Sequence, residues 1–180
     1  MHKDVHRILI SNRTIKQAVH KLALKINKDY KHKKPILIGI LKGCLPFYNE
    51  LFLQLTCDPI MDFMIVSSYI GTNSHNIKIV ADLRQNIVGR HVIIVEDIVD
   101  TGKTLKRVIE ILKLRKPTSI KVACLLDKPN GRINNFEPNY TCFKIDPVFA
   151  IGYGLDYNEH YRNLPYIGEL KKSIYVKMSK

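Results

Sequence analysis

The segment at residues 92–105 reads V-I-I-V-E-D-I-V-D-T-G-K-T-L and constrains the fold more than any other part of the chain. It begins with four apolar, β-branched residues, a pattern typical of a strand buried on both faces of a parallel sheet. From Leu105 onward, apolar residues recur at helical spacing, at Leu105, Val108, Ile109 and Leu112. Residues 100–104 are therefore predicted to form the turn between a strand and the helix that follows it.

This turn is suited to bind an anion. Hydroxyl groups, a glycine and the free N–H groups of a helix N-terminus together form a natural phosphate site. Glu96 and Asp97 are expected at the carboxyl end of the strand, where ligands bind in open α/β sheets. Because carboxylates repel a phosphate, we expect ribose hydroxyls and a hard cation such as Mg²⁺ to share the site. The segment thus predicts a site for a sugar phosphate and a metal ion.

Two other interpretations of this segment compete with a ligand site. The ending G-K-T is shared with the P-loop of nucleotide hydrolases, but that motif requires a glycine at the position of Asp97. The carboxylates could also be a solvated strand end and a helix cap, because Asp and Thr are common at such positions. The full string of acidic, hydroxyl and glycine residues favours a ligand site over both alternatives.

The rest of the chain alternates between predicted helices and strands. Helices are expected at residues 14–30, 47–55 and 105–115, with Ser11 or Asn12 as the cap of the first. Residues 69–76 are polar and are expected to form a loop, and strands are expected at residues 36–41, 62–67, 77–81, 92–95, 120–126, 140–145, 149–153 and 174–176. This alternation predicts an α/β fold with a doubly wound, mostly parallel sheet. The chain ends are expected to form a small hood subdomain over the carboxyl edge of the sheet.

Length and composition indicate a single enzyme domain covering residues 1–180. Hydrophobic residues make up 46% of the chain, which excludes extensive disorder. The longest apolar runs are too short to cross a bilayer, and the N-terminus lacks the apolar core of a signal peptide. The four cysteines include no C-x-x-C pair, so we expect small core residues in a reducing cytoplasm at Cys44, Cys57, Cys124 and Cys142.

The formal net charge of +13 is unusual and suggests nucleic-acid binding as one function. The lysines are scattered, however, with only small clusters at residues 30–34 and 170–172, and no aromatic residues interleave with a basic patch. A positive field would also attract a highly charged anionic substrate. We therefore expect no nucleic-acid partner, and a nucleic-acid-binding regulator is kept as the alternative function.

Three further segments are expected to reach the same edge of the sheet. Lys42 precedes a glycine after a predicted strand, and such a pair can bind a diphosphate, although Lys-Gly after a strand is usually a plain turn. Lys128 follows another strand, and its ammonium group could donate to a ring carbonyl. Residues 149–162, F-A-I-G-Y-G-L-D-Y-N-E-H-Y-R, offer an aromatic ring, a carboxylate at Asp156 and a guanidinium at Arg162.

The string E-D-I-V-D-T-G-K-T resembles the 5-phosphoribosyl 1-diphosphate (PRPP) signature of type I phosphoribosyltransferases at every position that the signature restricts. The segments L-K-G, S-S-Y, L-L-D-K-P, F-x-x-G-Y-G-L-D-Y and Y-R-N-L-P-Y-I-G also occur, in this order. With them the chain resembles hypoxanthine phosphoribosyltransferases of the short bacterial type over residues 5–170. Adenine, orotate and uracil phosphoribosyltransferases share the signature but not L-L-D-K-P and G-Y-G-L-D-Y.

The resemblance implies roles at the PRPP end of the site. Asp100 is implied to be the catalytic residue, which handles the proton on purine N7. Glu96 and Asp97 are implied to contact the ribose hydroxyls and Mg²⁺. The 5′-phosphate is assigned to Thr101, Gly102, Lys103 and Thr104, and the diphosphate to Leu41, Lys42, Gly43, Arg162, Ser68 and Tyr69. Ser68 and Tyr69 begin the loop that is expected to close over the site, and a non-proline cis peptide bond is expected before Lys42.

The resemblance also implies how the base is held. Lys128 is implied to bind the purine 6-oxo group, and Phe149 to stack on the base. Contacts at the edge of the base are assigned to Ala150, Leu155 and Asp156, and Asp156 is also expected to reach a second Mg²⁺. The resemblance thus implies Mg²⁺-dependent transfer of the phosphoribosyl group of PRPP to N9 of hypoxanthine, and of guanine, in purine salvage. A homodimer or homotetramer is expected.

Overall fold

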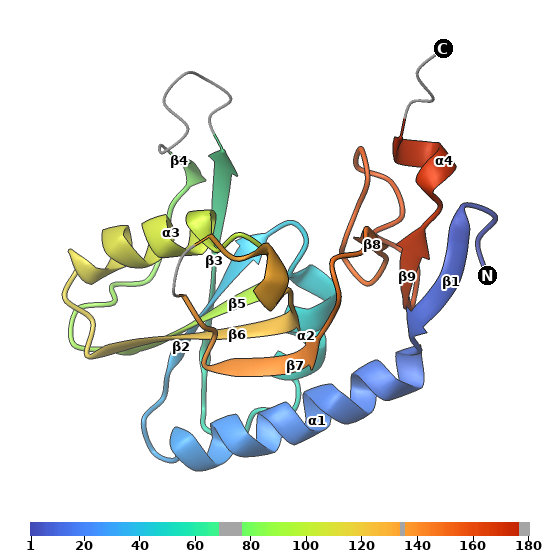
Figure 1. Ribbon diagram of the computed structural model, residues 1–180. Helices are drawn as coiled ribbons and strands as arrows, with labels where there is room; N and C mark the ends of the chain where they lie inside the picture. Colours follow the sequence, from blue (N-terminus) through green and yellow to red (C-terminus); the bar gives the residue numbers. More distant parts are fainter. Residues whose placement is uncertain (69–76, 134–135, 177–180) are drawn as a thin grey trace.

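The computed structural model describes residues 1–68, 77–133 and 136–176. The predicted loop at residues 69–76 lies outside these ranges, and with it Tyr69 and its expected diphosphate contact. The described chain forms a large sheet, helices on both of its faces and a smaller sheet made from the two ends of the chain (Figure 1).

A six-stranded sheet in the order β4-β3-β2-β5-β6-β7 forms the centre of the fold. Its strands are β2 (Ile36–Leu41), β3 (Ile60–Ser68), β4 (Ile77–Ala81), β5 (His91–Val99), β6 (Ser119–Asp127) and β7 (Tyr140–Lys144). All neighbours pair in parallel except β4, which runs antiparallel to β3 at one edge. The chain builds outward in one direction from β2 and in the other from β5. Ligands of such sheets bind where the strand order reverses, here at the carboxyl ends of β2 and β5.

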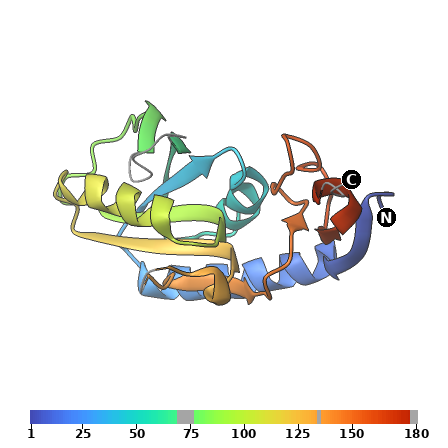
Figure 2. The same ribbon diagram turned by 45° about the horizontal axis from the view of Figure 1, so that its top comes forward.

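Helices cover both faces of this sheet, which confirms the doubly wound arrangement (Figure 2). α1 (Asn12–Asp29) and α2 (Leu45–Phe52) share one core with Leu37 and Ile93 of the sheet. α3 (Lys103–Lys113) packs on the opposite core, which contains Ile38 and Ile94. Successive residues of a strand point to opposite faces, so the apolar runs in β2 and β5 supply both cores.

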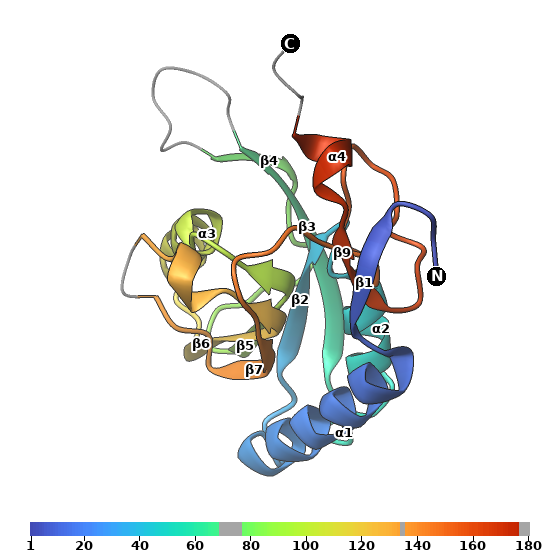
Figure 3. The same ribbon diagram turned by 45° about the vertical axis from the view of Figure 1, so that its right-hand side comes forward.

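The two ends of the chain form the hood that the sequence predicted. β1 (Val5–Ile10) pairs antiparallel with β9 (Ile167–Leu170), and β9 pairs with β8 (Ala150–Ile151). A short helix, α4 (Lys172–Tyr175), follows β9. Figure 3 shows the hood standing beside the large sheet, with β1 leading directly into α1. The hood therefore places residues 149–162 next to the carboxyl edge of the large sheet.

Several element boundaries differ from the prediction. β5 continues to Val99 because Ile98 and Val99 pair with β6, so Glu96 and Asp97 lie inside the strand and not at its end. α2 begins two residues earlier than predicted, with a proline in its first turn, where the missing N–H costs nothing. The predicted strand at residues 149–153 shrinks to Ala150–Ile151, because Gly152 and Tyr153 both have positive φ.

The strand predicted at residues 174–176 is wrong. Those residues belong to α4 and its C-terminal cap, where the N–H groups of Ile174 and Val176 donate to the carbonyls of Lys171 and Lys172. Their hydrogen bonds are local, so no ladder to another strand forms. β1, β9 and the 3-10 turn η1 (Pro129–Gly131) were not predicted as elements.

Most of the cysteines lie in the core. No cysteine is in a disulfide among the described residues, and three of the thiols are buried, at Cys44, Cys57 and Cys124.

Of the helices described, none combines the length and the apolar character that a membrane span requires.

Gly154 sets how closely the hood approaches the large sheet, and its substitution tests this contact. A Cβ atom at Gly154 would lie 2.0 Å from the carbonyl oxygen of Gly43, and its φ is +101°. Gly154→Ala should lower the free energy of unfolding by about 2–5 kcal/mol, from backbone strain plus the clash. Gly89→Ala is the control, because Gly89 has φ +66° but no described atom within 4 Å of the added Cβ. Its cost should be about 1–2 kcal/mol in urea denaturation. Equal losses for the two variants would show that the hood is not held closely.

Candidate active site

The turn between β5 and α3 forms an open anion cradle. Gly102 precedes the helix in a left-handed conformation, with φ +75°, and offers no side chain to cap the first turn. The N–H of Lys103 makes a long hydrogen bond, 3.4 Å, to the hydroxyl of Thr101. Thr101 and Lys103 are exposed and Thr104 is half-buried. The helix N-terminus therefore points its N–H groups and partial positive charge at solvent, as a phosphate site requires.

A carboxylate and an ammonium group face each other beside this cradle. Asp100 follows β5 and Lys128 follows β6, and the Lys128 Nζ atom lies 3.7 Å from Oδ2 of Asp100. The Lys128 side chain is only 14% exposed, whereas that of Asp100 is 51% exposed. The backbone N–H of Lys128 donates to the carbonyl of Val99 at 2.9 Å, which ties the two strand ends together. Gly131 also abuts Asp100, since a Cβ atom there would come 2.1 Å from its Oδ1 atom.

The turn after β2 meets β5 on the other side. The Leu41–Lys42 peptide bond is cis, as predicted. Gly43 then packs against the carboxylate of Asp97, because an added Cβ atom would lie 1.8 Å from Asp97 Oδ2. A side chain at Gly43 would therefore displace this carboxylate. The arrangement brings Leu41, Lys42 and Gly43 to the same edge as the acidic residues of β5.

Residues 154–162 of the hood bring acids and bases to this edge. Arg162 lies 3.0 Å from Asp156 Oδ1 and 3.4 Å from Glu159 Oε2, and its other terminal nitrogen donates to the Gly154 carbonyl at 2.8 Å. Lys42 Nζ lies 3.1 Å from Glu159 Oε2, so one carboxylate bridges the two cations. Lys42 and Arg162 lower the pKa of Glu159 below its usual value, with the hydrogen bond from Lys42 as the largest cause. A ligand with several anionic oxygens could replace Glu159 between these cations.

The folded protein disfavours the charged forms of the two β5 acids, Glu96 and Asp97. Burial, and then the neighbouring charge of Asp97, raise the pKa of Glu96 well above its usual range. Burial is also the main cause that raises the pKa of Asp97 to about 6, and the charge of Asp156 adds to it. The Ile98 N–H group and the charge of Arg162 act in the opposite direction. A bound cation at this place would favour the charged forms of both carboxylates.

These carboxylates suit a hard cation that also binds a substrate. Within the described ranges, no three His, Cys, Asp or Glu side chains gather closely enough to form a metal cage. Mg²⁺ needs no such cage, because it is commonly held by one or two carboxylates together with water and substrate phosphates. The raised pKa of Asp97, caused mainly by burial with a further contribution from the charge of Asp156, is the observation that fits a cation near these two residues. The metal ligands Glu96, Asp97 and Asp156 remain a prediction.

Apart from Lys128, the residues assigned to the base lie in the hood. Phe149 packs its ring edge-on against Tyr157, at 5.4 Å between ring centroids, and at a tilt against Tyr175, at 4.9 Å. Ala150 and Leu155 are buried. These contacts hold Phe149 from within the hood, and its base-stacking role remains a prediction. The role of Ser68 also remains a prediction, although its backbone ends β3 opposite Ile77.

Several residues at the site were not predicted from the sequence. Glu159 pairs with both Lys42 and Arg162, Gly154 touches Gly43, and Gly131 lies against Asp100. Each of these contacts joins segments far apart in the chain or depends on the path of a turn. The only local signal was the clustering of acids and a base within residues 154–162.

Comparisons with known proteins show which families and structures the chain is similar to. A family model described as a phosphoribosyl transferase domain matches residues 8–158. A hypoxanthine-guanine phosphoribosyltransferase of Streptococcus pneumoniae is 50% identical over 177 residues, which cover 97% of this chain and 98% of the relative. A crystal structure of a hypoxanthine phosphoribosyltransferase from Staphylococcus aureus has a TM-score of 0.95 and 41% identity, over 98% of this chain and 97% of the other. A hypoxanthine phosphoribosyltransferase from Trypanosoma cruzi, in complex with the product IMP, has a TM-score of 0.91 and 38% identity, over 97% and 99%.

Asp97→Asn should stabilise the metal-free protein near neutral pH. Folded Asp97 keeps its proton up to about pH 6, whereas the usual pKa is 3.8, so the free energy of unfolding falls as the pH rises between these values. Asparagine avoids this loss, and the variant should gain about 1–3 kcal/mol over the wild type at about pH 7.5 and almost nothing near pH 4. Urea denaturation at several pH values measures the difference.

Asp82→Asn is the control with the opposite sign. A hydrogen bond from Arg115 lowers the pKa of Asp82, so this variant should lose stability, by less than about 1 kcal/mol because the pair is solvent-exposed. A destabilised Asp97→Asn protein at neutral pH would contradict the assigned cost of burying the Asp97 charge.

Proposed function

The chain belongs to the phosphoribosyltransferase family, and on this premise we propose that it transfers the 5-phosphoribosyl group of PRPP to N9 of hypoxanthine or guanine. The products are IMP or GMP and diphosphate, and the reaction serves purine salvage. The chain is an enzyme of the pentosyltransferase class. The names of its relatives support hypoxanthine and guanine as the bases. No comparison supports the alternative of a nucleic-acid-binding regulator.

The observation that carries the proposal is the pairing of Asp100 with Lys128 next to the open N-terminus of α3. A 6-oxopurine presents a carbonyl oxygen and N7 side by side on one edge. An ammonium group and a carboxylate 3.7 Å apart match these two atoms, because Lys128 can donate to the oxygen and Asp100 can accept a proton at N7. A 6-amino group, which is a donor, would face the Lys128 ammonium without an acceptor.

PRPP is proposed to lie along the carboxyl edge from α3 to the hood. Its 5′-phosphate fits the cradle of residues 101–104, where N–H groups, hydroxyls and the Lys103 charge converge. Its diphosphate fits between Lys42 and Arg162, which both pair with Glu159. Diphosphate carries more charge than one carboxylate and can displace it from both cations.

The chemistry places positive charge where the leaving group develops negative charge. As diphosphate leaves C1′, Arg162 and Lys42 stabilise the oxygens that receive the electron pair. Glu96, Asp97 and Asp156 would hold Mg²⁺, which would supply positive charge to the diphosphate and a ligand position to the ribose hydroxyls. Asp100 accepts or shares the proton at N7, which raises electron density at N9 for its bond to C1′. Lys128 holds the base in the orientation that this bond requires.

The remaining expectations concern the protein in the cell. Assembly as a homodimer or homotetramer, a cytoplasmic location and a single domain over residues 1–180 remain predictions from the sequence. The expected closure of the loop that begins at Ser68 also remains a prediction.

Base specificity tests the proposed function directly. Purified protein with PRPP and Mg²⁺ should convert hypoxanthine to IMP and guanine to GMP, and should leave adenine unconverted because of Lys128. Product formation can be followed by chromatography, with reactions lacking Mg²⁺ or PRPP as controls. Efficient formation of AMP from adenine would contradict the assigned role of Lys128.

The role of Asp100 can be tested by removing its basicity while keeping its size. Asp100→Asn should lower kcat by roughly 10²- to 10⁴-fold and leave PRPP binding almost unchanged, since only proton transfer is lost. Asp146→Asn serves as a control, because Asp146 is an exposed carboxylate outside the site. Near-normal turnover of Asp100→Asn would show that another group serves N7.

A further inference from the structure

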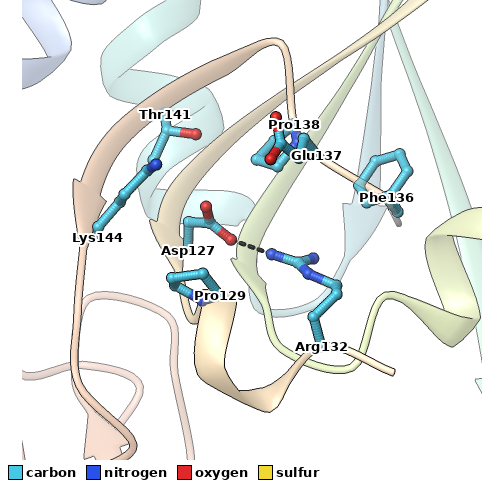
Figure 4. A pocket seen from close by; sticks show the side chains of 8 residues that line it. All are labelled: Asp127, Pro129, Arg132, Phe136, Glu137, Pro138, Thr141 and Lys144. Carbon is cyan, nitrogen blue, oxygen red and sulfur yellow. Dashed lines mark hydrogen bonds and ion pairs between the residues drawn. The ribbon is translucent and has the colours of Figure 1, made fainter. Parts of the chain in front are cut away.

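A buried ion pair lies directly behind the turn that carries Lys128. Asp127 is the last residue of β6, and its side chain is 6% exposed. The Arg132 side chain is 9% exposed, and its guanidinium donates a hydrogen bond to Asp127. Figure 4 shows the two side chains meeting in a cavity of about 380 Å³, with the ring of Phe136 close to the guanidinium. The contacts assigned to PRPP and the base involve neither side chain.

The pair closes one tight turn. Asp127 lies two residues before η1 and Arg132 directly follows it, so the ion pair joins the two ends of the turn. Two backbone hydrogen bonds also stabilise the turn. The N–H of Gly131 donates to the Lys128 carbonyl, and the N–H of Arg132 donates to the Pro129 carbonyl, both at 3.1 Å. The path of the turn therefore depends on the two ends staying together.

The turn at residues 127–132 supplies two residues that lie against Asp100, namely Lys128 and Gly131. Lys128 at its beginning lies 3.7 Å from the Asp100 carboxylate, and Gly131 near its end packs against the same carboxylate. A shift of the turn would move the ammonium group and would change the space available to the base. Geometry at a reacting centre is sensitive to displacements of this size.

Stability alone does not account for the ion pair. Removing two charges from water is costly, and replacing a buried pair by apolar residues of similar size is often neutral or stabilising. The Nη1 atom of Arg132 is also buried and has no hydrogen-bond partner among the described residues, which adds to the cost. Apolar residues of similar size would therefore cost the fold little, whereas a directional contact can hold a turn in one conformation.

We propose that Asp127 and Arg132 are positioning residues that hold Lys128 and Gly131 in place around Asp100, and thereby set the affinity and the 6-oxo selectivity for the base. This inference rests on the proposed function, because it assigns Lys128 to the purine. The pair touches no substrate and acts through the turn. Its loss should affect the base and not PRPP, which is bound by the α3 cradle and the cations near the hood.

The test uses the double variant Asp127→Leu/Arg132→Met, which removes both charges and leaves no unpaired ion. Its KM for hypoxanthine should rise about 10- to 100-fold, while its KM for PRPP should stay within about two-fold of the wild type. The ratio of kcat/KM for hypoxanthine to kcat/KM for adenine should also fall. Arg132→Lys keeps the ion pair and should retain most of the affinity for hypoxanthine. The matched control is Asp82→Leu/Arg115→Met, which removes an exposed Asp–Arg pair and should leave both KM values unchanged.

Hydrogen exchange gives a measurement that does not depend on catalysis. The amides of Gly131 and Arg132 should exchange faster in ligand-free Asp127→Leu/Arg132→Met than in the wild type, with the α1 amides unchanged. If the wild type transfers no phosphoribosyl group to any purine, the proposed function fails, and exchange alone then decides whether the pair holds the turn. A folded double variant with a wild-type KM for hypoxanthine, or with unchanged exchange at both amides, would overturn the proposal. A lower Tm with unchanged KM values would reduce the pair to a stabilising contact and would also overturn it.

Discussion

Burial of acidic side chains at the carboxyl edge of the large sheet is the constraint on which the site depends. Glu96 and Asp97 are consecutive residues of β5, and burial is the largest cause that raises the pKa of each. The charge of Asp97 adds to the shift of Glu96, and the charge of Asp156 adds to that of Asp97. Groups placed in this way weaken the folded protein in the absence of a cation. This cost in stability is offset when a cation and an anionic substrate bind, because the same carboxylates then attract the cation and the bound ligands stabilise the folded protein. The carboxylates that lower the stability of the folded protein are thus the ones assigned to bind the cation and the substrate in the proposed reaction.

The fold brings these groups together by joining three strand ends. The turn after β2 places Gly43 against Asp97, and the backbone bond from Lys128 to Val99 joins the end of β6 to that of β5. The hood closes the arrangement through Gly154, which packs on the Gly43 carbonyl and accepts a hydrogen bond from Arg162. Each of these contacts involves a backbone segment packed closely against its neighbour. The backbone of the sheet and its turns therefore positions the side chains of the site.

Much of this arrangement was predictable from local sequence, and the failures have a physical reason. The apolar runs of β2 and β5 and the helical spacing from Leu105 fixed the two cores, because period and burial are local properties. The hood strands β1 and β9 were missed because their pairing joins the two ends of the chain. For the same reason the contacts of Glu159 could not be foreseen. The longer β5 arose from pairing with β6, which extended the strand past the two acids.

The titration of Asp97 is the most direct measurement of this account. A ¹³C-labelled protein allows the carboxyl resonance of Asp97 to be followed against pH by NMR, first without ligands and then with Mg²⁺ and PRPP. Burial of Asp97 predicts a midpoint near pH 6 in the free protein, well above the usual value of 3.8. When the cation and substrate are bound, the midpoint should fall below that usual value, since an adjacent positive charge favours the ionised form. A midpoint near 3.8 in the free protein, or one that stays near 6 with both ligands bound, would contradict the account.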